Sequence, residues 1–409
     1  MAKQDLFAGA DYYQLDEWLT EEQLLIRNSV RDWVKKELSP VINEYAQRAK
    51  FPSFLVPGLA SVGAFGAFVP VEYGGQGLDH TSYGLIMQEL ERGDSGIRST
   101  ASVQGSLVMY PILSFGSETQ KRRFLPRLAS GEMIGCFGLT EPGYGSDPAG
   151  MLSRITPLVR GAGLGTEASA TAGAGLDYVL NGSKMWISNA PIADIAIVWA
   201  KDERDDIRGM IVERGMPGFT TPETHDKWSL RASSTGELHF DDVRIPAANM
   251  LPGVKGLKGP LSCLNSARYG IAWGAVGAAM DAYDTALRYS LERHQFGKQI
   301  GAFQLQQKKL AEMITSITKA QLMVHRLGQL KNENRATPAQ ISMAKRNSVE
   351  TAQNVVREAR QLVGAMGITG DYSLMRHMMN LESVVTYEGT HDIHLLITGM
   401  DITGINAFV

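Results

Sequence analysis

Hydrophobic side chains recur every three or four residues near the start of the chain. Thr20 and Gln23 have the spacing of an N-terminal capping box, and apolar residues follow at positions 26, 30, 33, 34 and 38 before Ser39-Pro40. This pattern predicts an amphipathic helix over residues 21–38. Similar patterns predict shorter helices, and we therefore expect an α-helical domain over residues 1–135; the shorter helices cover 54–62, 82–91 and 118–129.

From residue 136 the pattern changes to short runs of β-branched and aromatic residues. Residues 178–180 and 184–188 flank Asn181-Gly182, a dipeptide that tolerates the positive φ angles of a tight turn. The sequence therefore predicts a β-hairpin here. Further strands are predicted over 195–199, 238–240 and 243–245, and we expect a small β-barrel-like domain over residues 136–252.

Beyond residue 253 the pattern is helical again. Long periodic segments cover 268–293 and 304–332, and Thr337-Pro338 with Gln340 supplies the cap, first-turn proline and capping glutamine that begin a third helix. Long amphipathic helices joined by short connections pack as an antiparallel bundle. The chain is therefore predicted to be mainly α with a β middle domain, and to end in a four-helix bundle over residues 253–409.

Composition narrows the possible partners. The 409 residues are 44% hydrophobic and 20% charged with a net charge of -3, no basic run stands out, and no apolar stretch has membrane-spanning length. We therefore expect neither nucleic acid nor a membrane as a partner. The first residues lack a signal pattern, so a cytoplasmic location is expected. Cys136 and Cys263 lie in apolar surroundings and are predicted to be reduced core thiols.

A Gly- and Ala-rich tract, residues 161–175, interrupts the β region. It begins Gly161-Ala162-Gly163, like a dinucleotide-binding fingerprint. Thr166 occupies the third glycine position, however, and no strand and acidic residue follow at the required intervals. We reject a nucleotide site there and predict a mobile surface excursion between strands.

Glu388 lies where a helical pattern must break. It is followed by Gly389, between an apolar run that ends at Val385 and another that begins at Ile393. A turn of this kind presents the carboxylate among apolar neighbours, where desolvation raises its pKa toward the range of a general base. The alternative is a solvated glutamate in a polar loop, and the local sequence leaves both open.

Metal and hydrolase chemistry have little support. Glu388 and His391 form a Glu-x-x-His motif with His394 nearby, but a di-iron carboxylate site needs a second such motif and two further glutamates. Gly389 also interrupts the helix that would align the ligands. A Ser-His-Asp hydrolase is not supported, because no serine lies in a Gly-x-Ser-x-Gly elbow. We therefore predict no metal site.

Residues 135–148 indicate a different chemistry. A predicted strand end is followed by glycines, prolines and hydroxyl residues, whose backbone N–H groups can hold phosphates or the edge of an isoalloxazine-like ring. Three stretches follow in order: Trp186-Ile187-Ser188, the turn 293–297 and the turn 387–390. With these four stretches at these separations, the chain resembles the acyl-CoA dehydrogenase family over essentially its whole length. Residues 97–104 and 267–274 resemble its glutaryl-CoA dehydrogenase branch in particular.

The resemblance implies an FAD enzyme that removes two hydrogens across the α and β carbons of an acyl-CoA thioester. Glu388 matches the base that takes the α-proton, while the flavin accepts the β-hydrogen as hydride. Hydrogen bonds to the thioester oxygen stabilise the developing enolate. The resemblance assigns further substrate contacts to Ser99, Ser146, Asn265, Arg268 and Gly389.

Two sets of flavin contacts are implied by the same resemblance. Residues expected to touch the FAD of their own subunit are Phe137, Leu139, Thr140, Gly145, Ser146, Trp186, Ile187 and Ser188. Residues expected to reach the FAD of a neighbouring subunit are Arg293, Phe296, Gln304, Gln361, Gly364 and Ala365. Thr390 and Phe408 are further cofactor contacts. Contacts that cross between subunits imply an obligate homo-oligomer, in this family usually a tetramer.

The identity of the acyl group rests mainly on Arg98. A lone arginine is most often a surface or structural residue, but by resemblance Arg98 clamps the distal carboxylate of a dicarboxylic acyl-CoA and is oriented by Glu91. Tyr387 matches a tyrosine that accompanies decarboxylating enzymes. The expected reaction is oxidation and decarboxylation of glutaryl-CoA to crotonyl-CoA and CO2, with electrons passed to an electron-transferring flavoprotein.

Three alternatives stay open at this point. The first is a short- or branched-chain monocarboxylic acyl-CoA dehydrogenase in which Arg98 has a structural role. The second is a glutaryl-CoA dehydrogenase that does not decarboxylate. The third is a flavin-bearing scaffold without dehydrogenase activity, against which the presence of Glu388 counts.

Overall fold

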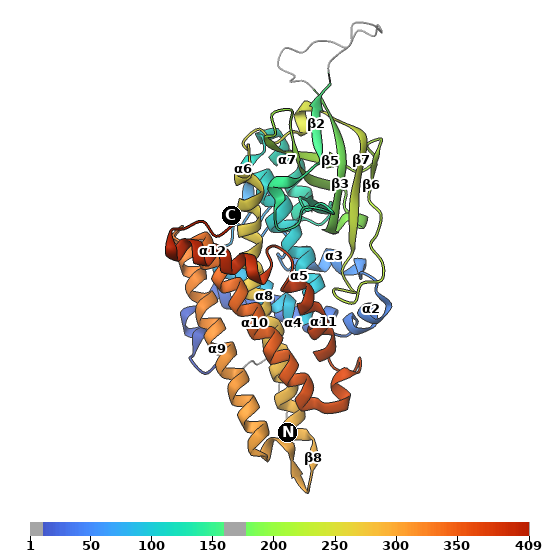
Figure 1. Ribbon diagram of the computed structural model, residues 1–409. Helices are drawn as coiled ribbons and strands as arrows, with labels where there is room; N and C mark the ends of the chain where they lie inside the picture. Colours follow the sequence, from blue (N-terminus) through green and yellow to red (C-terminus); the bar gives the residue numbers. More distant parts are fainter. Residues whose placement is uncertain (1–10, 159–176, 409) are drawn as a thin grey trace.

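The structure is a computed structural model that describes residues 11–158 and 177–408. Along the chain, two helical parts flank a β-sheet, which confirms the predicted fold class (Figure 1). The sheet lies toward one end of an elongated molecule, and the long C-terminal helices reach the other end. Among the described residues, no helix combines the length and apolar character that crossing a membrane requires.

The N-terminal part is made of short helices. At its start the predicted capping box is present, because Thr20 Oγ1 accepts the Gln23 N–H at 3.2 Å and Gln23 Oε1 accepts the Thr20 N–H at 3.0 Å. A π-helical turn, Val34–Leu38, continues the first helix to the residue before Ser39. The helices are α1 (Glu21–Trp33), α2 (Ile42–Arg48), α3 (Val56–Ser61), α4 (His80–Gly93), α5 (Ser95–Ser102), α6 (Tyr110–Phe115) and α7 (Glu118–Ala129).

A seven-stranded sheet follows in the middle of the chain, with strand order β1-β4-β2-β3-β7-β6 and β5 paired to β4. β1 and β4 run parallel, so the carboxyl end of β1 leads out of the sheet into residues 139–148. The strands are β1 (Gly135–Gly138), β2 (Arg154–Pro157), β3 (Tyr178–Ser188), β4 (Ile195–Lys201), β5 (Ile207–Glu213), β6 (Phe219–Thr220) and β7 (Thr235–Ile245).

The predicted hairpin at Asn181-Gly182 is wrong. β3 runs through this dipeptide and pairs with β7, with a register shift between Leu180 and Gly182. Gly182 has a φ of 137°, and a Cβ there would lie 2.4 Å from Ser153 Oγ and 2.7 Å from Ser153 Cα. The Asn181 side chain forms two 2.8 Å hydrogen bonds with Asp242 of β7. The dipeptide instead forms a β-bulge, at which the backbone of β3 closely approaches Ser153. Bulges and tight turns favour the same residue types.

Long helices dominate the C-terminal part. The helix predicted over 268–293 begins ten residues earlier, and Thr337 and Gln340 form the predicted capping box at the start of α10. A short hairpin of β8 (His294–Gln295) and β9 (Lys298–Gln299) follows α8. The helices are α8 (Lys258–Glu292), α9 (Gln304–Asn332), α10 (Pro338–Val363), α11 (Leu374–Val384) and α12 (His391–Thr403).

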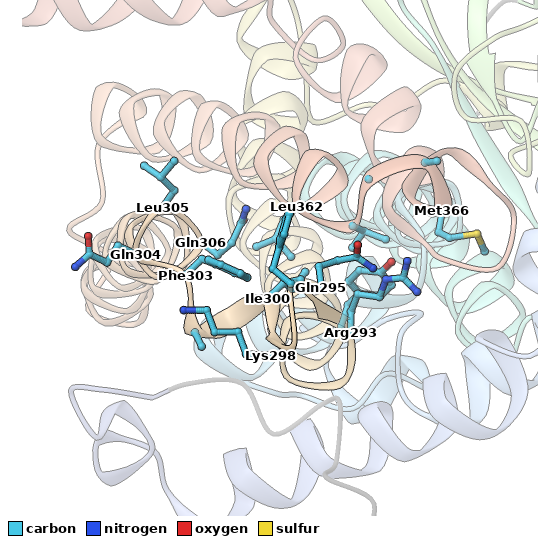
Figure 2. A pocket seen from close by; sticks show the side chains of 16 residues that line it. Arg293, Gln295, Lys298, Ile300, Phe303, Gln304, Leu305, Gln306, Leu362 and Met366 are labelled. Carbon is cyan, nitrogen blue, oxygen red and sulfur yellow. The ribbon is translucent and has the colours of Figure 1, made fainter.

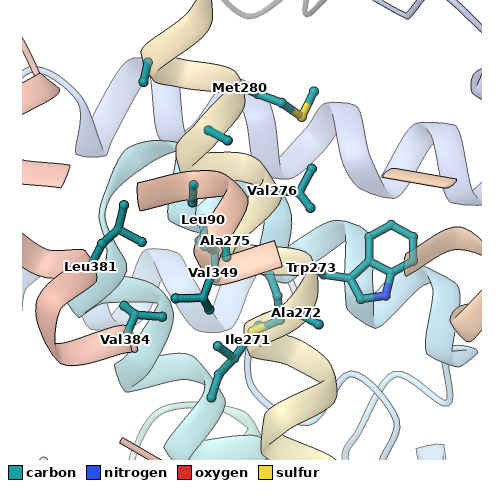
Figure 3. Close-up of a cluster of buried hydrophobic side chains, with 14 of the residues drawn as sticks. Leu90, Ile271, Ala272, Trp273, Ala275, Val276, Met280, Val349, Leu381 and Val384 are labelled. Atoms are coloured by element: carbon teal, nitrogen blue, oxygen red, sulfur yellow. The ribbon is translucent and has the colours of Figure 1, made fainter. Parts of the chain in front are cut away.

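The largest core joins the two helical parts around α8 (Figure 3). Trp273 of α8 is fully buried, and a Cβ at Gly84 of α4 would lie 2.4 Å from its ring, so the glycine allows the two helices to approach closely. Leu90 of α4, Val349 of α10 and Leu381 of α11 belong to the same cluster. This packing fixes α4, α10 and α11 relative to one another, and the candidate site is built on these helices.

Two further predictions concern the thiols and the Gly/Ala-rich tract. Cys136 and Cys263 are buried free thiols, as predicted, and burial raises the pKa of each to about 12. The tract at 161–175, with its rejected nucleotide fingerprint, lies outside the described residues.

Candidate active site

Glu388 lies in a tight turn between α11 and α12. The backbone N–H groups of Thr386 and Tyr387 both donate to Ser383 O, which closes the end of α11. Glu388 then adopts a left-handed φ of 52°, and Gly389 follows with a φ of 97°. Thr390 caps α12, since its Oγ1 accepts the Ile393 N–H. The helix break predicted at Glu388-Gly389 is therefore present.

Two buried cations bind the backbone of this turn. Lys345 Nζ of α10 donates to Tyr387 O at 3.1 Å and to Gly389 O at 2.8 Å. Arg268 Nε of α8 donates to Glu388 O at 2.7 Å. Lys345 was absent from the sequence-based site, although it lies on the apolar stripe of its helix, four residues after Ile341. A lysine in such a position is a pattern that could have identified it.

The Glu388 carboxylate is poorly solvated. Its Oε2 is buried and has no hydrogen-bond partner among the described residues. Burial raises the pKa of Glu388 to about 7, while the positive charges of Arg98, Lys345 and Arg268 oppose that rise. The carboxyl group can therefore take up and release a proton near neutral pH, which is the property expected of a base at this turn.

Arg98 and Glu91 are buried and form a cluster with Tyr387 of this turn, which is partly buried. Arg98 Nε lies 2.5 Å from Glu91 Oε2, and Arg98 Nη2 donates to the Tyr387 hydroxyl. The Arg98 Nη1 and Glu91 Oε1 atoms are buried and unpartnered within the described chain. Gly274 of α8 makes room for the cluster, because a Cβ there would lie 2.1 Å from Glu91 Oε2. Arg98 thus keeps one N–H-bearing nitrogen available in a site from which water is largely excluded.

The other predicted substrate residues lie in four different parts of the chain. Ser99 follows Arg98 in α5 and is buried. Asn265 lies in α8 and its Oδ1 accepts from Arg268 Nη1 at 3.3 Å, which ties it to the Glu388 turn. Gly389 is in the turn itself, and a Cβ there would lie 3.0 Å from the His394 ring. Ser146 is exposed in the loop after β1.

The residues predicted to touch FAD in the same subunit come together from two segments. The Met185 N–H of β3 donates to Thr140 O at 2.9 Å, and Lys184 Nζ donates to Leu139 O at 3.2 Å, so β3 lies against the loop after β1. Trp186 has a φ of 60° and leaves 57% of its surface exposed. Around it, Gly145 and Ser146 are exposed while Phe137, Leu139 and Ile187 are buried, with Ser188 ending β3.

This arrangement fits a flavin. An exposed aromatic ring, held in a strained backbone conformation near the end of β3, lies next to a glycine-containing loop that is open to solvent. No atom of the described residues lies within 4 Å of the Cβ position of Gly145, so a ligand can approach that backbone closely. Flat aromatic ligands bind to such combinations of apolar surface and backbone N–H groups.

The residues predicted for a neighbouring subunit's FAD form a separate site. Arg293, Phe296, Gln304, Gly364 and Ala365 line one cavity of about 900 Å³ between the β8–β9 hairpin and the C-terminal end of α10 (Figure 2). Gln361 lies beside it and its Oε1 accepts from Lys309 Nζ at 2.9 Å. The lining also includes residues that sequence analysis missed, among them Tyr289, Gln295, Lys298, Phe303 and Met366.

These two sets of predicted flavin contacts lie far apart within one chain. In Figure 1 the β8–β9 hairpin is at the end of the helical bundle opposite to the sheet. Phe408 is exposed beyond α12, and Thr390 belongs to the Glu388 turn. A single subunit therefore does not bring all the predicted cofactor residues to one ligand.

The two histidines near Glu388 are not arranged as metal ligands. Among the described residues no group of three or more His, Cys, Asp or Glu side chains is placed to hold a metal ion. His394 is buried in the second turn of α12, and burial lowers the pKa of its imidazole to about 3. It packs against Gly389 as a neutral ring rather than as a ligand.

Family comparison covers almost the whole chain. The N-terminal domain of acyl-CoA dehydrogenase matches residues 20–132, its middle domain matches 136–243 and its C-terminal domain matches 254–403. A probable acyl-CoA dehydrogenase of Bacillus subtilis (strain 168), YngJ, is 38% identical over 387 residues, which are 93% of this chain and 97% of that protein.

Solved structures agree with the sequence matches. A glutaryl-CoA dehydrogenase from Mycobacterium smegmatis, in complex with FADH2, is 45% identical with a TM-score of 0.91 and covers 97% of this chain and 98% of its own. Butyryl-CoA dehydrogenase from Megasphaera elsdenii is 36% identical with a TM-score of 0.87 and covers 94% and 98%. The chain therefore belongs to the acyl-CoA dehydrogenase family and is an FAD-dependent oxidoreductase.

Proposed function

We propose that this enzyme oxidises and decarboxylates glutaryl-CoA to crotonyl-CoA and CO2. The observation that carries the proposal is Arg98, which is fully buried beside Glu388 and whose Nη1 has no hydrogen-bond partner within residues 11–158 and 177–408. A buried guanidinium with a free donor is suited to a carboxylate, because charge-assisted hydrogen bonds are strongest where water is excluded. The similarity to a glutaryl-CoA dehydrogenase at 45% identity supports the same substrate.

Glu388 is proposed as the base that takes the α-proton of the thioester. Its carboxyl pKa of about 7 suits this role, since a base is most effective when its pKa lies near the working pH. The bound FAD would supply the acceptor for the β-hydrogen. Arg268 and Lys345 hold the backbone of the turn, and the Glu388 backbone N–H is proposed to donate to the thioester oxygen as negative charge develops there.

Decarboxylation is assigned to the cluster around Tyr387. Arg98 would hold the distal carboxylate of the substrate, with Glu91 fixing the guanidinium from its other side. Burial raises the pKa of Tyr387, so its hydroxyl stays a neutral donor and acceptor close to that carboxylate. Glu388, protonated in the first step, would return a proton to the dienolate that forms when CO2 leaves.

A monocarboxylic acyl-CoA is the second candidate substrate. Arg98 already binds Glu91 and Tyr387, so a purely structural role is consistent with its geometry. Butyryl-CoA dehydrogenase from Megasphaera elsdenii is also similar over 94% of this chain. Glutaryl-CoA and butyryl-CoA, compared as reductants of the same purified protein, separate the two substrates.

We further propose a homo-oligomer, with a tetramer as the expected state, and an electron-transferring flavoprotein as the electron acceptor. The support for an oligomer is the distance within one chain between the loop after β1 and the cavity at the β8–β9 hairpin. A neighbouring subunit would bring its cavity to the distal part of the FAD. The cytoplasmic location stays a prediction from the sequence.

Replacement of Glu388 by glutamine tests the base directly. Glu388→Gln is expected to keep the absorbance spectrum of bound FAD and to slow flavin reduction by acyl-CoA at least ~10²-fold, the smallest effect usual for loss of a general base. Glu382→Gln, in an exposed position of α11, is the matched control and should reduce its flavin at the normal rate. Reduction of the Glu388→Gln enzyme at the rate of the control would refute the assignment.

A further inference from the structure

Three consecutive carbonyls of the Glu388 turn accept hydrogen bonds from buried cations. Lys345 Nζ donates to the carbonyl oxygens of Tyr387 and Gly389, and Arg268 Nε donates to the carbonyl oxygen of Glu388 between them. Lys345 has no exposed surface and comes from α10, whereas Arg268 comes from α8. Two helices of the bundle therefore clamp the backbone on either side of Glu388.

The turn needs such a clamp because its backbone is strained. Glu388 has a φ of 52°, in the left-handed region that non-glycine residues seldom adopt. Conformations of this kind persist where the surroundings over-determine them, and they are common at functional sites. Without the ammonium group, two carbonyls would lose their donors, and the turn would be free to relax toward a more usual φ.

Lys345 also contributes charge. Two of the groups that face it belong to the turn: Glu388 itself and Tyr387, whose ring centroid lies 5.9 Å from Lys345 Nζ. The others are Glu91 of α4, Arg98 of α5, Arg268 of α8, and His391 and His394 of α12. Burial lowers the pKa of Lys345 to about 7, and the negative charge of Glu388 opposes that fall. In its protonated form, Lys345 favours the ionised form of the Glu388 carboxyl group. The lysine thus acts on both the position and the protonation state of Glu388.

We propose that Lys345 is a positioning residue for the reaction: through its hydrogen bonds to Tyr387 O and Gly389 O it holds the Glu388 turn in its strained conformation, and its charge keeps the carboxylate ready to accept a proton. This inference rests on the proposed role of Glu388 as the base. It assigns Lys345 no contact with substrate or flavin.

Lys345→Met tests the proposal, because methionine fills a similar volume without a donor or a charge. The matched control is Lys331→Met in α9. Lys331 Nζ also lies over a tyrosine ring, 5.5 Å from the Tyr269 centroid. The carbonyls of the Glu388 turn, in contrast, are bonded to Lys345 and Arg268. For each variant, FAD content, thermal melting, the limiting rate of flavin reduction and the dissociation constant of the acyl-CoA are measured.

We expect Lys345→Met to retain FAD and to reduce it ~10–100-fold more slowly at saturating acyl-CoA, with a dissociation constant within about threefold of the wild-type value. The pH midpoint of the reduction rate should rise by roughly one unit, since removal of the cation makes the Glu388 carboxylate harder to form. Lys331→Met should leave both the rate and the midpoint at their wild-type values.

Lys345→Gln separates geometry from charge and covers the case in which Lys345→Met does not fold. The NH2 group of glutamine still donates hydrogen bonds but carries no charge, so we expect a smaller loss of rate together with the same rise of the midpoint. A wild-type limiting rate and midpoint in the Lys345 variants would overturn the proposal, as would a loss confined to the dissociation constant. Flavin reduction at the normal rate by Glu388→Gln would instead overturn the base assignment on which the proposal rests.

Discussion

Glu388 is surrounded by three cations, and its carboxyl pKa is nevertheless raised. Arg98, Arg268 and Lys345 all favour the carboxylate, but the loss of water around it has the larger effect and raises the pKa to about 7. These cations donate their hydrogen bonds to other groups: to Glu91, to Tyr387 and to the backbone of the turn. In the described part of the chain, Oε2 of the carboxylate thus has no hydrogen-bond partner, which suits a base that must accept a proton.

This balance predicts the pH dependence of flavin reduction. The base acts in its ionised form, so the limiting rate should be low below the pKa of Glu388 and should rise with pH through a midpoint near 7. Stopped-flow reduction by saturating acyl-CoA, measured from acid to alkaline pH, gives this midpoint. A rate that is independent of pH across the neutral range would show that Glu388 does not titrate in the step observed.

Arg98 is predicted to decide between a dicarboxylic and a monocarboxylic substrate. We expect the double variant Glu91→Gln/Arg98→Met to lose ~10²-fold or more of kcat/KM for glutaryl-CoA, because a buried charge-assisted pair with the distal carboxylate is lost. The Glu91 change prevents a buried carboxylate from being left without its cation. Turnover of butyryl-CoA should change little, and an equal loss for both substrates would indicate a structural role for Arg98.

At the scale of single residues, the local sequence pattern predicted the Glu388 turn but not the Lys345 hydrogen bonds that hold it. Glu388-Gly389 between two apolar runs marks a helix break, and such a break can be read from neighbouring residues alone. Lys345 is 43 positions away from Glu388 in the chain, and its contact depends on how α10 packs against α12. Long-range packing of this kind has no local signature except the lysine in an apolar stripe.

Among the elements, β3 shows how one dipeptide can serve two geometries. Asn181-Gly182 suits a tight turn because both residues tolerate unusual φ angles, and a bulge within a strand makes the same demand. β3 pairs with β2 on one side, where Asn181 lies opposite Arg154, and with β7 on the other, where Gly182 lies opposite Phe240. The choice between turn and bulge is therefore made by sheet pairing. Helices were predicted better, since their repeats are local: α7 and α9 have the predicted bounds, although α8 begins ten residues before its predicted start.

Gly182→Ala is predicted to destabilise the sheet more than a comparable change in a loop. Alanine there must adopt a φ of 137° and would place its Cβ 2.7 Å from Ser153 Cα, for an expected cost of about 2–4 kcal/mol. Gly215→Ala is the control, because Gly215 also has a positive φ of 87° but has no atom within 4 Å of its Cβ position. Thermal melting of the FAD-bound variants should show the larger loss for Gly182→Ala, and equal losses would contradict the steric account.

At the scale of the whole molecule, the most important feature is that the predicted flavin contacts lie at two ends of the subunit. The loop after β1 and the strand β3 form one surface, and the cavity beside the β8–β9 hairpin forms another (Figures 1 and 2). Helix and strand patterns predicted where these segments lie in the sequence. The separation of the two surfaces depends on the length of α8, which begins at Lys258, ten residues before the predicted start.

If neighbouring subunits share each FAD, two inactive chains should complement one another. A Glu388→Gln chain lacks the base, and an Arg293→Ala/Gln361→Ala chain lacks contacts in the cavity, but a mixed oligomer would contain sites with both parts intact. Co-expression should restore on the order of a quarter of wild-type activity for random pairing in a symmetric dimer. Activity no greater than the sum of the two variants alone would argue against a shared site.

Anaerobic titration with glutaryl-CoA tests the central claim most directly, with the flavin absorbance followed during the titration and the product identified by mass spectrometry. The proposed function predicts that glutaryl-CoA bleaches the flavin and is converted to crotonyl-CoA with release of CO2. Bleaching by butyryl-CoA but not by glutaryl-CoA would contradict the substrate assignment, and accumulation of glutaconyl-CoA would contradict the decarboxylation step.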